Sequence, residues 1–167
     1  MKSTRDSLVS EYITEALLIL LMKQDFSSIS ITDICKRAGT TRMSFYRNFE
    51  SKEDIIRKWL QRQTDSFLDR SDISYSNDSI QDYVVKLFTH LSAYKDIFIS
   101  LYSSGLSHLV KDEFDRVFIS IHQNEYDDYK SYFHAGGVYN LFYLWMKRGF
   151  VESPEKLAHK LSDLLSR

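Results

Sequence analysis

The chain has 167 residues, enough for one domain or for a small module joined to a larger one. Hydrophobic residues make up 43% of it, which excludes a disordered chain, and its one proline and five glycines favour long helices. The net charge of −1 does not favour binding to nucleic acid. However, residues 1–62 carry 11 basic and 8 acidic side chains, whereas residues 63–167 carry 11 basic and 15 acidic ones. The N-terminal third is therefore mildly basic and the remainder acidic.

The cysteine content and the hydropathy pattern suggest where the protein works. Cys35 is the lone cysteine, which excludes an internal disulfide and fits a reducing compartment. The first twelve residues lack the apolar core of a signal peptide, and no stretch reaches about 18 uninterrupted apolar residues. We therefore expect a cytoplasmic protein with no membrane partner.

The first two predicted helices are marked by helical apolar spacing and by a capping box. A first helix is expected over about 4–24, after which Asp25 could adopt the left-handed turn that glycine usually supplies. Ser30 and Asp33 have the spacing of a capping box and predict a short second helix. Gly39 is expected to end that helix.

Two more helices and a linker complete the N-terminal part. Thr41 can cap a third helix over about 42–48, and "SKED" at 51–54 predicts the start of a fourth. The polar stretch at 69–79, rich in Ser and Asp, has no helical period and predicts a linker. We expect a DNA-binding or interaction module over 1–62 and a helical regulatory region over 63–167.

Helical spacing continues after the linker. Apolar stripes run from Ile80 to Leu101, from Leu109 to Ile121 and over about 125–148, and Ser153 followed by Pro154 predicts a last helix. The chain is therefore predicted to be all-α.

The second and third predicted helices, with Gly39 between them, have the arrangement of a helix-turn-helix. On a helical wheel Phe45 can anchor the third helix to its core while Arg42, Met43, Tyr46 and Arg47 face outward. A helix presented in this way fits the major groove of DNA, where its N-terminal residues meet base edges. The alternative is an ordinary corner between core helices with a solvated basic face.

Residues 13–60 resemble the DNA-binding module of TetR-type bacterial transcriptional regulators. The resemblance rests on "SITDICKRAGTTRMSFYRNFESKEDII" and most of all on its Arg37-Ala38-Gly39 and Phe45-Tyr46 steps. The segment 134–158, "HAGGVYNLFYLWMKRGFVESPEKLA", resembles the C-terminal domain of regulators of this type from Firmicutes-like bacteria. Met43 stands where members often have a small residue, and it could contact a thymine methyl. The resemblance implies that DNA is contacted by Thr32, Thr40, Thr41, Arg42, Met43, Tyr46, Arg47, Asn48 and Lys52.

A single recognition helix makes few contacts, so such modules normally bind a palindrome as two-fold dimers. We expect the last two helices to pair with the same helices of a second copy as a four-helix bundle. The default expectation is that the regulator is a repressor. The alternative is that the aromatic residues of the last two helices fill the core of the protomer. The expected interface residues are Gly136, Gly137, Tyr139, Phe142, Tyr143 and Met146.

The middle helices resemble the variable effector region of the family, which in many members opens around a small apolar ligand. The alternatives are a packed aromatic core without a ligand, and an activator controlled by a protein partner. The residues that could line an effector pocket are Tyr94, Phe98, Phe114, Phe118 and Phe133.

Enzymatic activity is the rival class of function, and the sequence does not favour it. It contains no G-x-G-x-x-G, P-loop, H-E-x-x-H or G-x-S-x-G motif, and its five histidines have no metal-ligand spacing. We expect no catalytic residue, metal or cofactor. A second rival is a helical protein-interaction module whose helix-turn-helix no longer binds DNA.

Overall fold

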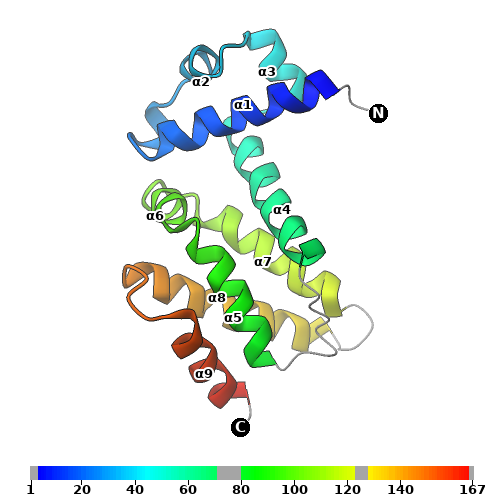
Figure 1. Cartoon of the computed structure of the whole chain (residues 1–167), viewed down its shortest axis with the longest axis vertical. Helices are drawn as coiled ribbons and strands as arrows, with labels where there is room; N and C mark the ends of the chain where they lie inside the picture. Colours follow the sequence, from blue (N-terminus) through cyan, green and yellow to red (C-terminus); the bar gives the residue numbers. More distant parts are fainter. Residues whose placement is uncertain (1–3, 71–79, 123–127, 166–167) are drawn as a thin grey trace.

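The structure is a computed structural model, and it describes residues 4–70, 80–122 and 128–165. These residues form helices and their connections, with no strand among them, which confirms the all-α prediction (Figure 1). The predicted linker lies outside the described residues from 71 to 79. The helices are α1 (Thr4–Leu21), a 3-10 helix (Phe26–Ser28), α2 (Ile31–Arg37), α3 (Arg42–Asn48), α4 (Lys52–Arg70), α5 (Ile80–Ser92), α6 (Lys95–Ser103), α7 (Ser107–His122), α8 (Asp128–Lys147) and α9 (Pro154–Leu165).

The helices α1, α2 and α3 pack together on the first turns of α4, at one end of the long axis of the molecule (Figure 1). Their shared core is made of side chains that are almost fully buried. Burial of large apolar side chains is the main stabilising term for so small a module. This core contains Ile13, Leu17, Ile34, Phe45, Phe49, Ile55 and Ile56.

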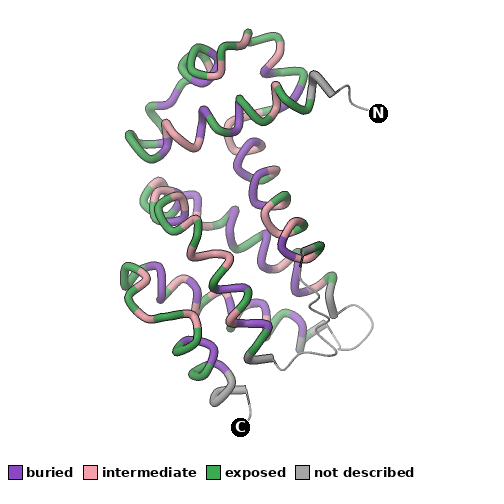
Figure 2. Tube along the Cα trace, viewed as in Figure 1, coloured by how far each residue is buried: buried purple, intermediate pink, exposed green. Residues whose placement is uncertain are grey.

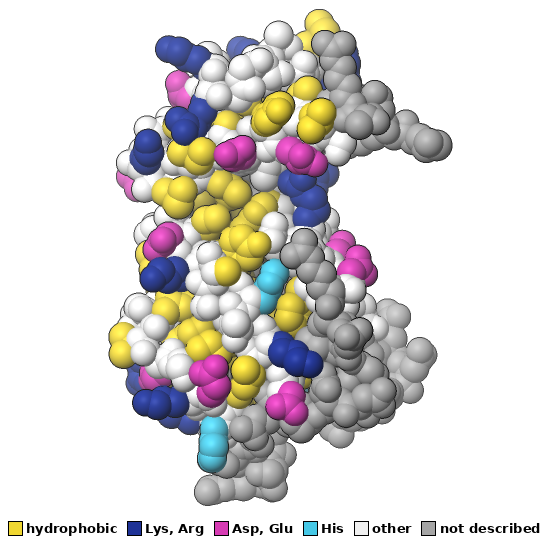
Figure 3. All heavy atoms as spheres, viewed as in Figure 1, with side chains coloured by type: hydrophobic (Ala, Val, Ile, Leu, Met, Phe, Trp, Pro, Cys, Tyr) yellow, Lys and Arg dark blue, Asp and Glu magenta, His cyan; other side chains and the backbone are white. Residues whose placement is uncertain are grey.

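The remaining helices form a second layer around the end of α4. α7 packs on α4 and α8, α9 packs on α5, and α6 contacts both α1 and α8. Among the described residues the inward sides of these helices are largely buried (Figure 2), and Phe88, Phe142 and Trp145 are almost fully buried there. Hydrophobic side chains also gather on the face seen in Figure 3, between α1 and the helices below it.

The local start and stop patterns are confirmed at most helix ends. Ser30 Oγ accepts from the backbone N–H of Asp33 at 3.1 Å while the Asp33 carboxylate accepts from the backbone N–H of Ser30 at 3.1 Å, a complete capping box. Gly39 ends α2 with φ +63°, a conformation that glycine adopts without strain. Pro154 is the first residue of α9. The left-handed turn expected at Asp25 is wrong, because Asp25 has φ −59° and ψ 138° and leads into the 3-10 helix.

The stripe from Ile80 to Leu101 is interrupted, which the sequence did not indicate. The chain turns at Ala93 and Tyr94, whose backbone N–H groups donate to the carbonyls of His90 and Leu91. The turn starts α6 in a new direction and brings α6 against α1. One predicted helix is therefore two, and the second touches the N-terminal module.

The predicted division at residue 62 falls within α4, which runs unbroken from Lys52 to Arg70. The two predicted regions are thus joined by a continuous helix. None of the helices in the described part has the length and apolar character to cross a membrane.

Candidate DNA-binding surface and regulatory cavity

The third helix is held by its buried side and by its N-cap. Thr41 Oγ1 accepts from the backbone N–H of Ser44 at 3.2 Å, which satisfies one of the unpaired donors of the first turn. Phe45 is fully buried and makes an edge contact with Tyr46 at 5.3 Å between ring centroids. The ring of Phe49 lies 6.1 Å from the ring of Phe45, measured between centroids. The helix is therefore fixed in rotation by aromatic packing.

The opposite side of α3 is open to solvent. Met43 is 75% exposed and Tyr46 is 54% exposed, and Arg42 and Arg47 are also exposed. We call these four residues the groove face. Two guanidinium groups, a phenol and a thioether on one short helix can form bidentate bonds to guanine or phosphate and an apolar contact to a thymine methyl.

The predicted threonines lie around this face. Thr32, in the first turn of α2, and Thr41 are exposed, and Thr40 is half-buried in the turn between the helices. The hydroxyl of Thr41 also donates to Ser44 Oγ at 3.2 Å. Thr32 and Thr40 therefore have hydroxyl groups at the edge of the groove face, whereas the hydroxyl of Thr41 caps the helix.

Two predicted contact residues point inward. Asn48 is only 5% exposed, and its Nδ2 donates to the Ser44 carbonyl at 2.9 Å. Lys52 Nζ donates to the carbonyls of Phe26 at 2.8 Å and Ile29 at 2.6 Å. Neither side chain belongs to the groove face in this structure, because each is committed to a backbone carbonyl within the module.

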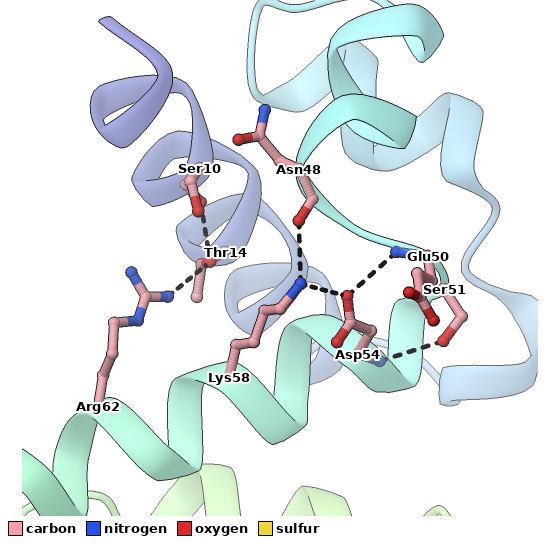
Figure 4. A network of polar contacts seen from close by, with 8 residues as sticks. All are labelled: Ser10, Thr14, Asn48, Glu50, Ser51, Asp54, Lys58 and Arg62. Atoms are coloured by element: carbon pink, nitrogen blue, oxygen red, sulfur yellow. Dashed lines mark hydrogen bonds and ion pairs between the residues drawn. The ribbon is translucent and has the colours of Figure 1, made fainter. Parts of the chain in front are cut away.

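A polar network along α4 contacts the middle of α1 and the end of α3 (Figure 4). Lys58 Nζ donates to the Asn48 carbonyl at 3.1 Å and pairs with Asp54 at 2.6 Å. Arg62 donates to the buried hydroxyl of Thr14 on α1 at 2.9 Å. Sequence analysis did not single out Lys58 or Arg62, although the four-residue spacing from Asp54 through Lys58 to Arg62 places them on one face of the helix.

Cys35 lies on the inner side of α2 and is 5% exposed. Burial raises the pKa of its thiol, an effect that the charge of Arg42 only partly offsets. A buried thiol with a raised pKa is a weak nucleophile, so Cys35 has the properties of a small core residue.

A small cavity lies between α4, α5 and α7. It has a volume of about 40 Å³ open to water and a mainly apolar wall. Phe98, Phe114 and Phe118 line it as expected. Phe133 does not, because it is 73% exposed on α8, and Tyr94 instead packs on Trp59 at 5.4 Å between ring centroids.

The polar part of the cavity wall was missed in the sequence. Glu113 is buried, and both of its carboxylate oxygens accept from Arg116, at 2.9 Å and 2.6 Å. Arg116 also bonds to Asp65 on α4 at 3.1 Å. Hydrogen bonding to Glu113, against some desolvation, raises the pKa of Arg116. The three residues tie α7 to α4 beside the cavity.

The exposed side of α8 has an unusual composition. Tyr129, Tyr132, Phe133, Gly137, Asn140 and Leu144 are exposed and Gly136 is half-buried; we call these seven residues the α8 face. The described exposed residues from 132 to 144 include no charged side chain. A Cβ added at Gly136 or Gly137 would meet no other atom within 4 Å, so nothing in the protomer requires glycine there.

Some of the expected interface residues belong to the protomer instead. Phe142 is 1% exposed and Met146 is 7% exposed, and Phe142 packs on Phe98 at 5.0 Å between ring centroids. Both are core residues and have no surface left for a partner. Tyr139 and Tyr143 are half-buried, and the Tyr143 hydroxyl lies 2.6 Å from that of Tyr102.

The predicted four-helix bundle pairs the last two helices with those of a second copy, and within the protomer α8 packs mainly on α7 and α9 on α5. Metal binding finds no support in the part of the chain that the structure describes, which contains no cluster of three His, Cys, Asp or Glu residues placed to hold an ion.

Two curated proteins are similar in sequence. The chain is 25% identical over 172 residues to the HTH-type transcriptional regulator YxbF of Bacillus subtilis, covering 97% of this chain and 44% of YxbF. It is 27% identical over 63 residues to the HTH-type transcriptional regulator AlkX of Mycobacterium tuberculosis, covering 38% of this chain and 30% of AlkX. The chain thus spans less than half the length of either relative.

Three solved structures share the fold. Lin0861 from Listeria innocua superposes with a TM-score of 0.81 at 15% identity, covering 99% of this chain and 93% of that one. The fatty acid degradation regulator FadR from Bacillus halodurans gives 0.66 at 15% identity, covering 99% and 96%. The dihydroxyacetone kinase operon activator DhaS gives 0.65 at 18% identity, covering 94% and 93%. At such identities the likeness concerns the fold alone.

Family models match both parts of the chain. Residues 13–58 match bacterial regulatory proteins of the tetR family, and residues 78–167 match the C-terminal region of transcriptional regulators. The first match contains the groove face, and the second contains the cavity and the α8 face. Together they agree with the expectation that the chain is not an enzyme. The chain belongs to the TetR family of DNA-binding transcriptional regulators.

Proposed function

We propose that this regulator acts in the cytoplasm as a homodimer that binds a palindromic operator and represses transcription there. The observation that carries this proposal is the pairing of two exposed faces with opposite chemistry. The groove face is cationic and hydroxylated, and the α8 face is aromatic, uncharged and contains two glycines. The first suits DNA, and the second suits another protein surface.

Contact with DNA is assigned to residues with exposed side chains. Arg42 and Met43 lie in the first turn of α3 and are assigned to base edges, because the N-terminal residues of a recognition helix meet them. Tyr46 and Arg47, one turn later, suit phosphate oxygens, as do the hydroxyls of Thr32 and Thr40. Thr41 contributes through its cap, which sets where the helix begins.

Dimerisation is assigned to the α8 face. Exposed aromatic side chains such as Tyr132 and Phe133 are enriched in protein interfaces, and glycines allow two helices to approach closely. Gly136 and Gly137 face open space in the protomer, which supports a second copy as the neighbour. A two-fold axis would bring each α8 against its mate.

The signal is assigned to the cavity between α4, α5 and α7. Glu113 lines the cavity and bonds to Arg116, and the pair of Arg116 with Asp65 joins α7 to α4, the helix that carries the DNA-binding module. A small ligand that widens the cavity would separate α7 from α4. The wall is mainly apolar and contains the Glu113 carboxylate, so it favours a mainly apolar molecule with one hydrogen-bond donor.

A second candidate is an activator controlled by a protein partner. The cavity of about 40 Å³ has room for only a few water molecules, which favours a signal that does not enter the core. The fold is shared with DhaS, which is named an operon activator. A reporter gene placed behind the selected operator separates the two, because deletion of the regulator raises expression for a repressor and lowers it for an activator.

The test of the main proposal begins with duplexes enriched from a random pool by the purified protein. We expect an inverted repeat, two protomers per duplex by sedimentation, and affinity that falls steeply with salt in fluorescence anisotropy. Arg42→Ala should reduce the preference for the enriched duplex over scrambled DNA. Arg47→Ala should weaken binding to both duplexes. An enriched sequence without two-fold symmetry, bound by one protomer, would contradict the dimeric operator.

A further inference from the structure

Two lysines of α4 have similar surroundings, although Lys58 also pairs with Asp54 at 2.6 Å. Lys52 Nζ bonds to the carbonyls of Phe26 and Ile29 and lies 4.4 Å from the centroid of the Phe26 ring. Lys58 Nζ bonds to the Asn48 carbonyl and lies 5.1 Å from the centroid of the Phe49 ring. Each ammonium group is thus bound to main-chain oxygen and lies over a buried phenylalanine.

The position of these contacts matters more than their number. Phe26 is the first residue of the 3-10 helix and Ile29 is its C-cap, and the next residue, Ser30, is the N-cap of α2. Asn48 is the last residue of α3. Lys52 therefore holds the beginning of the α2–α3 unit on α4, and Lys58 holds its end.

Both contacts have favourable electrostatics. The Ile29 carbonyl belongs to the C-cap of the 3-10 helix, and the Asn48 carbonyl is at the C-terminal end of α3, where the helix dipole is negative. A cation above an aromatic ring gains further stabilisation. Such an ammonium group would have to leave several contacts at once to reach a phosphate.

We infer that Lys52 and Lys58 are positioning residues that set the angle of the groove face, and that neither is a phosphate contact. The inference rests on DNA binding through α3. The beginning and the end of the α2–α3 unit are fixed on one rigid helix, so the groove face meets base edges in a single orientation. Loss of either lysine should reduce discrimination between sequences more than it reduces general attraction to DNA.

The experiment measures anisotropy with the enriched duplex and a scrambled duplex at four salt concentrations, for the full chain. Lys52→Met and Lys58→Met remove the charge and keep a flexible stem. Lys36→Met, on the exposed side of α2, is the matched control for the loss of one positive charge. All measurements are made well below the melting temperature of each variant.

For Lys52→Met we expect roughly tenfold weaker binding to the enriched duplex, about unchanged binding to the scrambled one, and an unchanged slope of log affinity against log salt. A phosphate contact would instead lower the slope by about 1 and weaken both duplexes. That result would overturn the inference. Unchanged affinity and discrimination with a lower melting temperature would also overturn it, because the lysine would then stabilise the fold without orienting α3.

Lys52→Arg sharpens the distinction. A phosphate contact keeps its charge in this variant and should bind as well as the wild type, whereas the larger planar guanidinium does not fit between the Phe26 and Ile29 carbonyls in the same way. We expect Lys52→Arg to lose discrimination as Lys52→Met does. Wild-type affinity and discrimination in Lys52→Arg would overturn the inference.

If Lys52→Met does not fold, Phe26→Leu removes only the ring below the ammonium group, with the same expected loss of discrimination in smaller measure. Wild-type discrimination in this variant would overturn the role of the ring. If the wild-type protein enriches no sequence at all, the proposed operator binding has failed, and this result is distinct from any outcome with the variants.

Discussion

The groove face of α3 and the α8 face are two exposed surfaces of the described chain, and they differ in almost every property. The first is a short helix whose exposed side carries two arginines and a tyrosine next to a capped N-terminus. The second is one side of a long helix with aromatic residues and two glycines, and its described exposed residues from 132 to 144 carry no charge.

This difference shows how partner chemistry can be inferred from exposed residues once the buried side is known. On α3, buried Phe45 explains why the arginines face outward. On α8, buried Val138, Phe142 and Trp145 occupy the inner side, so Phe133 on the outer side is not needed by the protomer core. Changes on the inner and outer sides of each helix should therefore have different effects.

The largest effect is expected on the inner side of α3. Phe45→Ala should destabilise the protein by about 3–5 kcal/mol, because it removes a fully buried ring and leaves a cavity. Met43→Ala, on the outer side, should change stability by less than about 0.5 kcal/mol. Urea unfolding followed by circular dichroism measures both. Equal losses would contradict the orientation of the helix.

The next effect is expected at the α8 face. Phe133→Glu places a charge on the uncharged surface, so the protein should become monomeric and lose at least about 100-fold in operator affinity, as expected when two linked sites become one. Sedimentation velocity and anisotropy give the two numbers. Met22→Glu, an exposed apolar residue beyond the end of α1, is the control for oligomeric state. If the Phe133→Glu protein is still a dimer, the interface lies elsewhere.

A smaller effect is expected at the link between the two regions. Arg116→Met leaves the buried Glu113 carboxylate without its partner and should cost about 2 kcal/mol in stability. Asp65→Asn removes only an exposed ion pair and should cost at most about 0.5 kcal/mol. Denaturant unfolding at pH 7 compares them. A loss in Asp65→Asn as large as in Arg116→Met would mean that the bond to α4, and not the burial of Glu113, is the stabilising contact.

The smallest effect concerns pH and the capping box. Hydrogen bonds from the side chain and then the backbone of Ser30 lower the pKa of Asp33 below its usual value of 3.8. The carboxylate therefore stabilises the fold at pH values above 3.8, and this contribution is lost as the pH falls through the lowered pKa. Asp33→Asn should have a lower melting temperature than the wild type at pH 7, and the gap should close under acid conditions below pH 3.8. A gap of the same size under acid conditions would exclude the charge as its cause.

Most of the N-terminal module could be predicted because its signals are local. The capping box at Ser30, the left-handed Gly39 and the cap at Thr41 each depend on residues within four positions of one another. The periodicity of α3 also placed Phe45 inside. Asn48 was expected at DNA from the family resemblance and not from the wheel, and the structure buries its side chain against the Ser44 carbonyl.

The C-terminal part was harder because aromatic residues at helical spacing have several possible neighbours. Phe118 and Phe133 have equal apolar character, yet one lines a cavity and the other is exposed. The break between α5 and α6 has no proline or glycine to mark it. Packing against Trp59 and α1, which no local pattern encodes, accompanies the turn there.

The sequence by itself determined that this protein is helical, where most of its helices begin and which side of α3 is polar, because capping and amphipathic spacing act over a few residues. Only the tertiary structure decided where the side chain of Lys52 is bound. Its partners are the carbonyls of Phe26 and Ile29, which precede it in the chain by 26 and 23 positions. A hydrogen bond over that separation depends on how α1, α2 and α4 pack, and no local pattern specifies that packing.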